Sequence, residues 1–227
     1  MISEVIKKRL QESNTRYFAC DNISDHIRPD EHDALIEELA AKFDSVLDSL
    51  LIDRANDPNS RGTGKRLAKM YLNETMAGRF HKSPKITSFP NTGENKYTGM
   101  LVVRSELKSL CSHHHQPVTG IAYIGIIPGD RVIGLSKYTR IAQHCARRGT
   151  LQEELCNDIA KQISIATMSN DIGVYIAATH GCCENRGIMA HSSLTQTTVL
   201  NGQFHDAHVK KEFFDNISLQ EKFTNGR

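Results

Sequence analysis

Three segments rich in Val, Ile and Tyr constrain the fold of this 227-residue chain more than any other feature. Their sequences are MLVVRSEL (100–107), PVTGIAYIGIIP (117–128) and GVYIAATH (173–180), and this composition predicts three β-strands. A short turn separates the first two segments, which is typical of antiparallel neighbours. The chain is therefore expected to contain an antiparallel sheet, with a last strand near residues 188–200.

Two helices are predicted between the second and third strands. Ser136 is expected to cap the first helix and Thr150 the second, because both are favoured N-cap residues. The apolar positions of the second helix recur every four residues, which indicates one buried face: Leu151, Leu155, Ile159 and Ile163. The resulting fold class is α+β, an antiparallel sheet backed by two helices on one face.

The first part of the chain is predicted to be helical. A short helix is expected over residues 2–11, and a second begins at Asp33, with apolar residues at Leu35, Leu39, Phe43, Val46 and Leu50. A third is expected through KRLAKMYLNETMAG (65–78), followed by a connecting loop over 81–99. We therefore predict an N-terminal helical region over 1–95 and a sheet-containing domain over 96–227.

Composition argues against several classes of protein. The chain has 28 Lys and Arg residues and 26 Asp and Glu residues. Its formal charge of +2 argues against a general nucleic-acid-binding surface. No apolar run approaches the roughly 20 residues that cross a bilayer. The N-terminal sequence shows no apolar signal segment, so a cytoplasmic location is expected.

Cysteine and histidine residues in two distant segments predict a metal site. Cys111 and His114 form a C-x2-H pair, and GCC (181–183) supplies thiols downstream. Two thiolates and one imidazole match the preferences of zinc, and three protein ligands leave one position for water. Cys111, His114 and Cys182 are the predicted ligands. The alternative is a closed, four-ligand site without a bound water. The candidates for its fourth ligand are His113, His115, His180 and Cys183.

The other cysteines are predicted to be structural. Without an export signal, six cysteines are expected to be thiols or metal ligands rather than a disulfide framework. Cys20, Cys145 and Cys156 are interpreted as small apolar residues, and Cys183 is expected in the core if the chain is extended there.

Four segments in a fixed order resemble the GTP cyclohydrolase I family. They are CSHHHQPVTG (111–120), VIGLSKYTRI (132–141), LQEELC (151–156) and HGCCENRG (180–187). KRLAKMY (65–71) resembles the end of that family's helical region, and the resemblance extends from about Asp33 to Phe214. It implies the tunnelling fold, with 96–227 as the catalytic domain. It also implies a homodecamer of two pentamers with active sites between subunits.

The resemblance also implies a role for each matched residue. Cys111, His114 and Cys182 take the zinc positions, while His113, His180 and Ser136 take catalytic positions. Residues at substrate-binding positions, for the nucleotide, its guanine ring and its triphosphate, are Arg66, Leu135, Ser136, Lys137, Arg140, Gln152, Glu153 and Arg186. Glu153 has a second interpretation, because Thr150-x-x-Glu153 also matches a helix capping box.

The implied reaction is the zinc-dependent hydrolysis of the GTP imidazole ring. Carbon C8 leaves as formate, and rearrangement of the sugar gives 7,8-dihydroneopterin triphosphate, the first step of folate, pterin or deazapurine synthesis. Zinc lowers the pKa of bound water from 15.7 to about 7, and histidine is suited to proton transfer near neutrality.

The sequence departs from the family at Ser112, where a glutamate is usual, and at His115 and Gln116. The loss of a carboxylate beside the metal is expected to change metal affinity or a proton path. Two alternatives stay open: a 7-cyano-7-deazaguanine reductase, suggested by SLC-x4-QP (109–117), and a non-catalytic nucleotide-binding zinc oligomer. The segment GLSK (134–137) argues against the first, and the pair His113 and His180 argues against the second.

Overall fold

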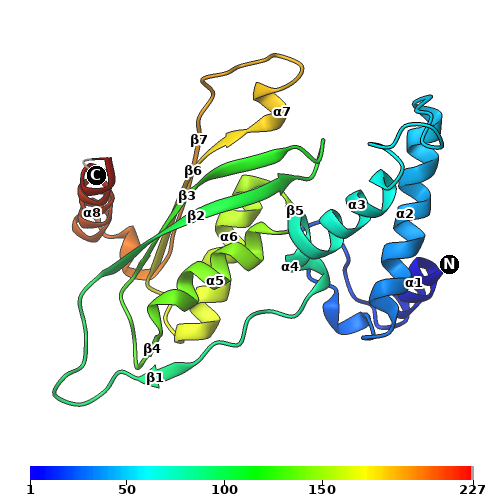
Figure 1. Cartoon of the computed structure of the whole chain (residues 1–227). Coiled ribbons are helices and arrows are strands. Elements are labelled where there is room, and N and C mark those ends of the chain that lie inside the picture. The colour runs from blue at the N-terminus through cyan, green and yellow to red at the C-terminus, as the bar shows by residue number, and fades with distance from the viewer. Residues whose placement is uncertain (226–227) are drawn as a thin grey trace. The chain divides into compact units, whose positions relative to one another are not determined.

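The computed structural model describes residues 1–225, which divide into two compact units (Figure 1). The first unit is Met1–Lys82, and the second begins at Ser83. The expected domain boundary between residues 95 and 96 stays a prediction. No helix among the described residues is long and apolar enough to cross a membrane.

The first unit is helical, as predicted. Its elements are α1 (Ile2–Glu12), the 3-10 turn η1 (Ser24–His26), α2 (Glu31–Ser49), α3 (Thr63–Met70), the π turn η2 (Tyr71–Thr75) and α4 (Ala77–Phe80). The buried face of α2 differs from the predicted one, because Val46 and Leu50 are exposed. Ile36 and Ala40 pack with Ala68 of α3 in a buried cluster, and the predicted residues Leu35, Leu39 and Phe43 are partly buried against it.

The helix predicted over 65–78 is interrupted in the structure. Met76 donates its backbone N–H to Tyr71 O at 3.0 Å, which is an i→i+5 bond. Such a bond widens the helix by one residue and separates α3 from α4. The sequence pattern predicted the apolar face but not this π turn.

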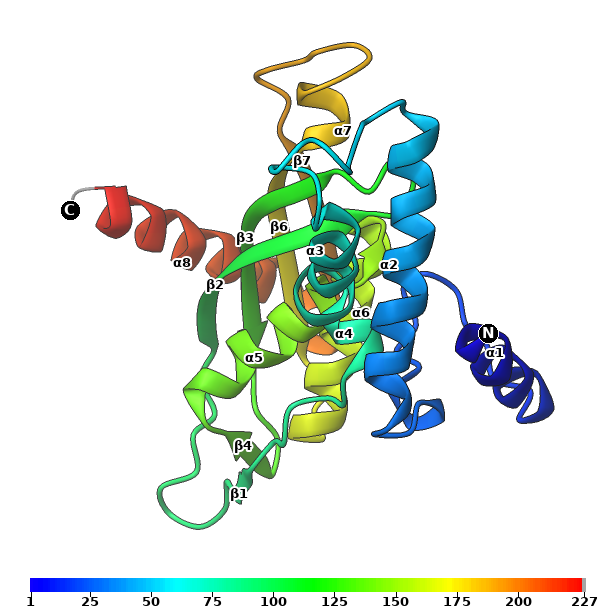
Figure 2. The same ribbon diagram turned by 45° about the vertical axis from the view of Figure 1, so that its right-hand side comes forward.

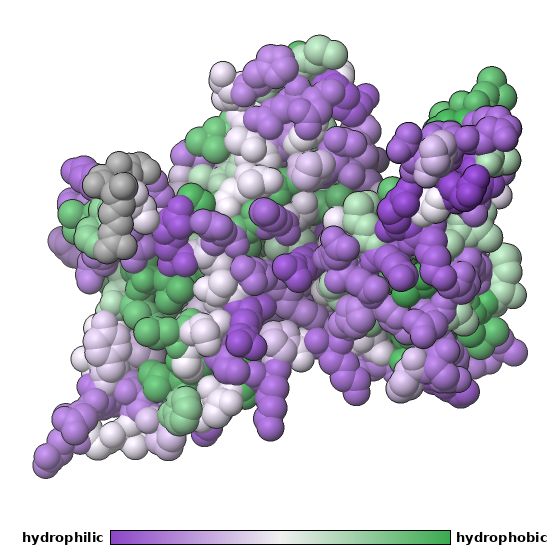
Figure 3. Space-filling view, viewed as in Figure 1, coloured by the Kyte–Doolittle hydropathy of each residue, from purple (hydrophilic) through white to green (hydrophobic). Residues whose placement is uncertain are grey.

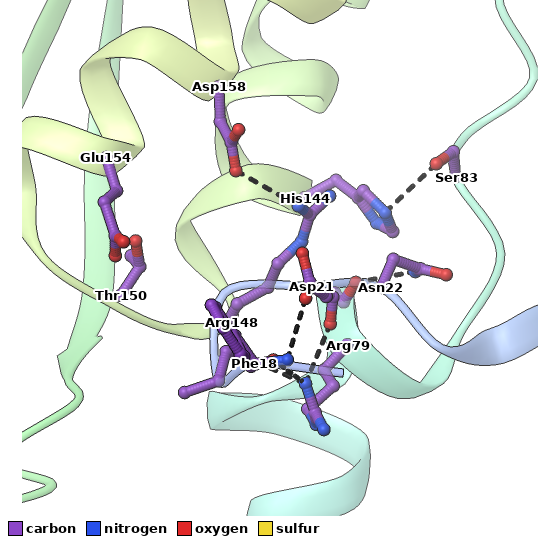
Figure 4. A network of polar contacts seen from close by, with 12 residues as sticks. Phe18, Asp21, Asn22, Arg79, Ser83, His144, Arg148, Thr150, Glu154 and Asp158 are labelled. Carbon is purple, nitrogen blue, oxygen red and sulfur yellow. Dashed lines mark hydrogen bonds and ion pairs between the residues drawn. The ribbon is translucent and has the colours of Figure 1, made fainter. Parts of the chain in front are cut away.

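Hydrogen bonds from side chains to backbone carbonyls hold the loop before η1 against α4 (Figure 4). The Arg79 guanidinium donates to four of these carbonyls: those of Tyr17, Phe18, Ala19 and Asp21. The Asn22 amide donates to Gly78 O and to His81 O, each at 2.7 Å. These bonds fix a segment that has little regular structure of its own.

The second unit is built on a five-stranded sheet, in the order β5-β2-β3-β6-β7. The strands are β2 (Leu101–Cys111), β3 (Pro117–Ile126), β5 (Gly149–Thr150), β6 (Ile172–His180) and β7 (Thr195–Leu200). All pairs are antiparallel except β5, which pairs in parallel with Leu110 and Cys111 alone. Inside the predicted loop, β1 (Ser88–Pro90) pairs with β4 (Arg131–Ile133), a ribbon that the sequence analysis did not predict.

Two helices cover one face of this sheet, α5 (Leu135–Ala146) and α6 (Gln152–Thr167), as Figures 1 and 2 show. Leu155, Ile159 and Ile163 of α6 are buried, as their spacing predicted. They pack against alternate residues of the strands, including Ala122 and Ile124 of β3. The predicted α+β class, an antiparallel sheet backed by two helices, is confirmed.

The opposite face carries an element that the sequence analysis did not predict, α8 (Ala207–Asn225), after the 3-10 turn η3 (Gly202–His205). Phe204 and Phe213 are fully buried, with ring centroids 5.3 Å apart. They lie over Gly125 and Gly173, which face each other across β3 and β6. A Cβ atom at Gly125 would lie 2.7 Å from the Phe213 ring, so this glycine pair makes room for the aromatic rings.

Both predicted helix caps are wrong by one or more residues. Helix α5 follows Gly134, so Ser136 is its second residue rather than its cap. Helix α6 follows Leu151, whose N–H donates to the Glu154 carboxylate at 3.3 Å. Glu154, drawn beside Thr150 in Figure 4, therefore makes the capping contact that the second interpretation of Glu153 assigned to Glu153. Glu153 is exposed and does not form the predicted capping box.

Candidate metal centre and active site

Three side chains from two distant segments meet at one end of the sheet. The ligand atoms of Cys111, His114 and Cys182 all lie within 4.8 Å of one another. Cys111 is buried, Cys182 is half-buried and His114 is exposed, so the cluster opens to solvent on the histidine side. This is the ligand set that the sequence predicted.

The tight turn between β2 and β3 brings Cys111 and His114 together. Cys111 N–H donates to Gln116 O and His115 N–H donates to Cys111 O, each at 2.9 Å. His115 closes the turn in the left-handed region, at φ 50°. The described metal group does not include His115, and the turn places His114 on the cluster instead.

Cys182 reaches the cluster from the short helix α7 (Gly181–Glu184), which follows β6 directly. A Cβ atom at Gly181 would lie 3.0 Å from Pro117 O, so this glycine lets α7 approach the start of β3 closely. The chain is helical here rather than extended, so the core position expected for Cys183 is wrong. Cys183 is half-buried, with its sulfur 4.0 Å from that of Cys182, and it lies outside the metal group.

The three donors fit a zinc ion. Tetrahedral zinc with bonds of about 2.0–2.3 Å needs donor atoms roughly 3.5–4 Å apart, a small contraction from the observed spacing. Burial and the adjacent Cys111 thiol raise the pKa of the Cys182 thiol to about 11. A metal ion reverses this effect because a coordinating thiol loses its proton.

Arg186 contacts the histidine of this cluster. Its Nη1 lies 3.1 Å from His114 Nε2. A guanidinium only donates hydrogen bonds, so His114 Nε2 is the acceptor in this contact. His113 is exposed on the same turn, with its ring centroid 6.3 Å from that of His114.

His180 ends β6, two residues before Cys182. Its Nε2 lies 2.7 Å from Gln152 Oε1 at the start of α6. Burial lowers the pKa of His180, and the negative charges of Glu153 and Glu184 oppose this shift. His180, Glu153 and Gln152 therefore form a second group of polar side chains at this end of the sheet.

Of the other predicted binding residues of the second unit, Leu135 lies at the far end of β2. Leu135 lines an apolar groove of about 660 Å³ together with Leu101–Arg104 of β2 and residues of α8. Figure 3 shows hydrophobic surface on this side of the second unit, next to α8. Arg104 precedes Cys111 by seven residues, roughly 24 Å of strand at about 3.4 Å per residue.

Ser136, Lys137 and Arg140 follow Leu135 in the first two turns of α5. Ser136 and Arg140 are exposed, and Lys137 Nζ donates to Lys85 O at 3.0 Å. Among the described hydrogen bonds, none joins this group to Cys111, His114 or Cys182.

Arg66 belongs to the first unit. Its guanidinium donates to Asn59 O at 2.5 Å and to Thr63 Oγ1 at 3.0 Å.

Two contacts of the site were not predicted from the sequence. The contact of Arg186 with His114 joins residues 72 positions apart, and that of Gln152 with His180 joins residues 28 apart. No local pattern indicates such pairs, although all four residues lie in the segments that carry the family resemblance.

Comparison with known proteins identifies close relatives. A family model described as GTP cyclohydrolase I matches residues 39–218. The GTP cyclohydrolase 1 of Flavobacterium johnsoniae is 35% identical over 220 residues, covering 94% of this chain and 97% of that protein. The enzyme of the same name from Aeromonas hydrophila is 37% identical over 170 residues, covering 74% and 77%. That from Buchnera aphidicola is 36% identical over 191 residues, covering 83% and 85%.

Proposed function

The chain belongs to the GTP cyclohydrolase I family of enzymes, and we propose that it opens the imidazole ring of GTP with a zinc ion held by Cys111, His114 and Cys182. The proposed products are formate, from C8, and 7,8-dihydroneopterin triphosphate. The convergence of these three donors within 4.8 Å carries the proposal. Zinc, when bound, supplies a Lewis acid that activates water near neutral pH.

The histidines provide proton transfer. His113 lies on the exposed turn and is assigned to donate a proton toward N7 as the ring opens. Burial lowers the pKa of His180, which favours its neutral form, and His180 is assigned to accept a proton. Ser136 is assigned a proton relay in the sugar rearrangement.

Charged side chains recognise the two ends of the nucleotide. Glu153 is exposed and does not cap its helix, so its carboxylate is assigned to the guanine N1–H and amino group. The proposed triphosphate contacts are the cations Arg66, Lys137, Arg140 and Arg186. Arginine provides paired planar donors for phosphate oxygens, whereas lysine acts as a point charge.

We propose that a second copy of the chain completes each site. Leu135, at the start of the group, lines a groove with Leu101–Arg104 of β2, and Arg104 lies roughly 24 Å of strand from Cys111, so we infer that the group serves the metal site of another copy. Among described residues, the side of β2 that faces away from β3 over Leu101–Ser109, and the outer side of β7, have no neighbouring strand. Such open edges favour strand pairing between copies. A decamer of two pentamers is the proposed assembly.

The physiological setting is part of the same proposal. We place the enzyme in the cytoplasm, at the first step of folate, pterin or deazapurine synthesis. The family match favours this activity over the reductase alternative.

Incubation of the purified protein with GTP and zinc tests the reaction. We expect equimolar formate and a fluorescent pterin after oxidation, and no turnover once a chelator removes the metal. GTP binding without formate would support the non-catalytic oligomer and refute the enzyme assignment.

The variant Ser112→Glu restores the carboxylate usual in the family. Because Ser112 lies next to Cys111 in the turn, we expect a change in metal affinity or kcat and a smaller change in KM. Absence of pterin from both this variant and the original protein would refute the assigned reaction.

A further inference from the structure

We propose that Gln152 acts as a positioning residue that fixes one tautomer of His180, with Thr197 holding Gln152 in place. This inference rests on the proposed function and assigns Gln152 a role other than guanine recognition. Gln152 is 4% exposed and lies between α6 and the strands β6 and β7.

The neighbours of Gln152 fix the orientation of its amide. Its Nε2 lies 3.2 Å from Ile176 O, 3.1 Å from Thr195 O and 3.1 Å from Thr197 Oγ1. Two of these partners are backbone carbonyls, which only accept hydrogen bonds. The nitrogen must therefore face β6 and β7, and the oxygen must face His180.

The orientation of the amide determines where His180 carries its proton. The Gln152 oxygen has no hydrogen, so the 2.7 Å contact requires a proton on His180 Nε2. The neutral imidazole then carries its hydrogen on Nε2, which leaves the lone pair on Nδ1. A histidine that works through one nitrogen needs a partner of this kind at the other.

The same contacts leave Gln152 little capacity to bind guanine. Both amide hydrogens are used within the fold, and the side chain is almost wholly buried. Glu153, exposed at the next position, is the better candidate for that role. Gln152 thus contacts His180, while Glu153 is left to contact the substrate.

Steady-state kinetics of the zinc-loaded enzyme distinguishes positioning from binding. Gln152→Met keeps the length of the side chain but removes its hydrogen bonds, and we expect kcat to fall roughly 10- to 100-fold, with KM for GTP changed less than about twofold. A rise in KM at unchanged kcat would show direct substrate binding and overturn the inference.

Thr197→Val is a milder variant that removes one acceptor and preserves shape. We expect kcat to fall roughly fivefold, again without a change in KM. Thr198→Val is the matched control, because alternation along β7 places Thr198, which is exposed, on the other face. Equal effects of the two threonine variants would argue against the proposed chain of contacts.

Nitrogen NMR of 15N-histidine-labelled, zinc-loaded protein reports the tautomer without requiring turnover. At about pH 8, above the ordinary imidazole pKa of roughly 6.5, we expect His180 in the Nε2–H form, assigned by loss of its signal in His180→Ala. Gln152→Met should give a mixture of tautomers. The Nδ1–H form in the unaltered protein would overturn the inference even if GTP is turned over. Correct tautomers without formate would refute only the proposed reaction.

Discussion

The buried carboxylate of Glu31 joins α1 to α2 within the first unit through an ion pair with Arg9. Neutralising this carboxylate is expected to lower the free energy needed to open α1 locally. Arg9 donates to both oxygens, from Nη1 at 2.8 Å and Nη2 at 2.6 Å, and Arg28 N–H donates at 2.8 Å. The Glu31 side chain is 7% exposed and that of Arg9 is 25% exposed. Glu31 is also the first residue of α2, where a negative charge faces the unpaired N–H groups of the helix.

The magnitude follows from the proton affinity of this carboxyl group. The hydrogen-bonded Arg9 guanidinium lowers the pKa of Glu31 from 4.5 to about 2. Because the folded-state pKa is depressed, the stabilisation is present above pH 4.5 and is lost as pH falls toward 2. A shift of this size corresponds to about 3 kcal/mol, and solvent access to Arg9 reduces the expected contribution to about 2 kcal/mol.

Hydrogen exchange of the α1 amides measures this contribution directly. At neutral pH, Glu31→Gln should raise their exchange by about 30-fold, the equivalent of about 2 kcal/mol. Glu37→Gln is the control, since the pair of Glu37 with Lys65 is exposed on both sides and contributes little. Equal protection of α1 in the two variants would refute the reasoning, as would a difference that persists when pH approaches 2.

The remaining predictions concern the metal, the core and the substrate. Cys182→Ala should abolish zinc binding and turnover, whereas Cys183→Ala should retain zinc measured by atomic absorption, because Cys183 lies outside the ligand group. Ile159→Ala should lower the free energy of unfolding in urea by about 3 kcal/mol, while Ile165→Ala, 65% exposed in the same helix, should change it by less than about 0.5 kcal/mol. Arg140→Ala should raise KM for GTP about tenfold with zinc content unchanged, and an unchanged KM would remove Arg140 from the phosphate contacts.

The sequence predicts most of the regular structure of the second unit, because its signals are local. Apolar spacing of four residues located α6, and β-branched runs located β2, β3 and β6. Ribbon β1–β4 and strand β5 are only two or three residues a strand, too short for a periodic pattern. Helix α8 is defined mainly by the packing of Phe213 and Ile217 against the far face of the sheet.

Helix starts show the limit of local rules. Thr150-x-x-Glu153 matches a capping box, but α6 begins one residue later, and Glu154 meets the Leu151 N–H instead. Gln152, the first residue of α6, is buried against β6 and β7, and a local sequence pattern does not encode a tertiary contact of that kind. The cluster of Cys111, His114 and Cys182 was predictable because two thiols and an imidazole are an uncommon combination. The contacts of Gln152 with His180 and of Arg186 with His114 were not, because amide and guanidinium groups are common throughout the sequence.

Cys111 ends β2, and Leu135 of α5 lies near the start of the same strand. Metal binding and catalytic activity are therefore expected to depend differently on assembly. A lone chain holds all three candidate metal donors, with Arg186 beside them, while Leu135 lines a groove at the other end of β2. Dilution should therefore leave metal content constant while specific activity declines as subunits part. Two inactive variants, one altered at each end of the strand, should regain partial activity when their subunits are exchanged.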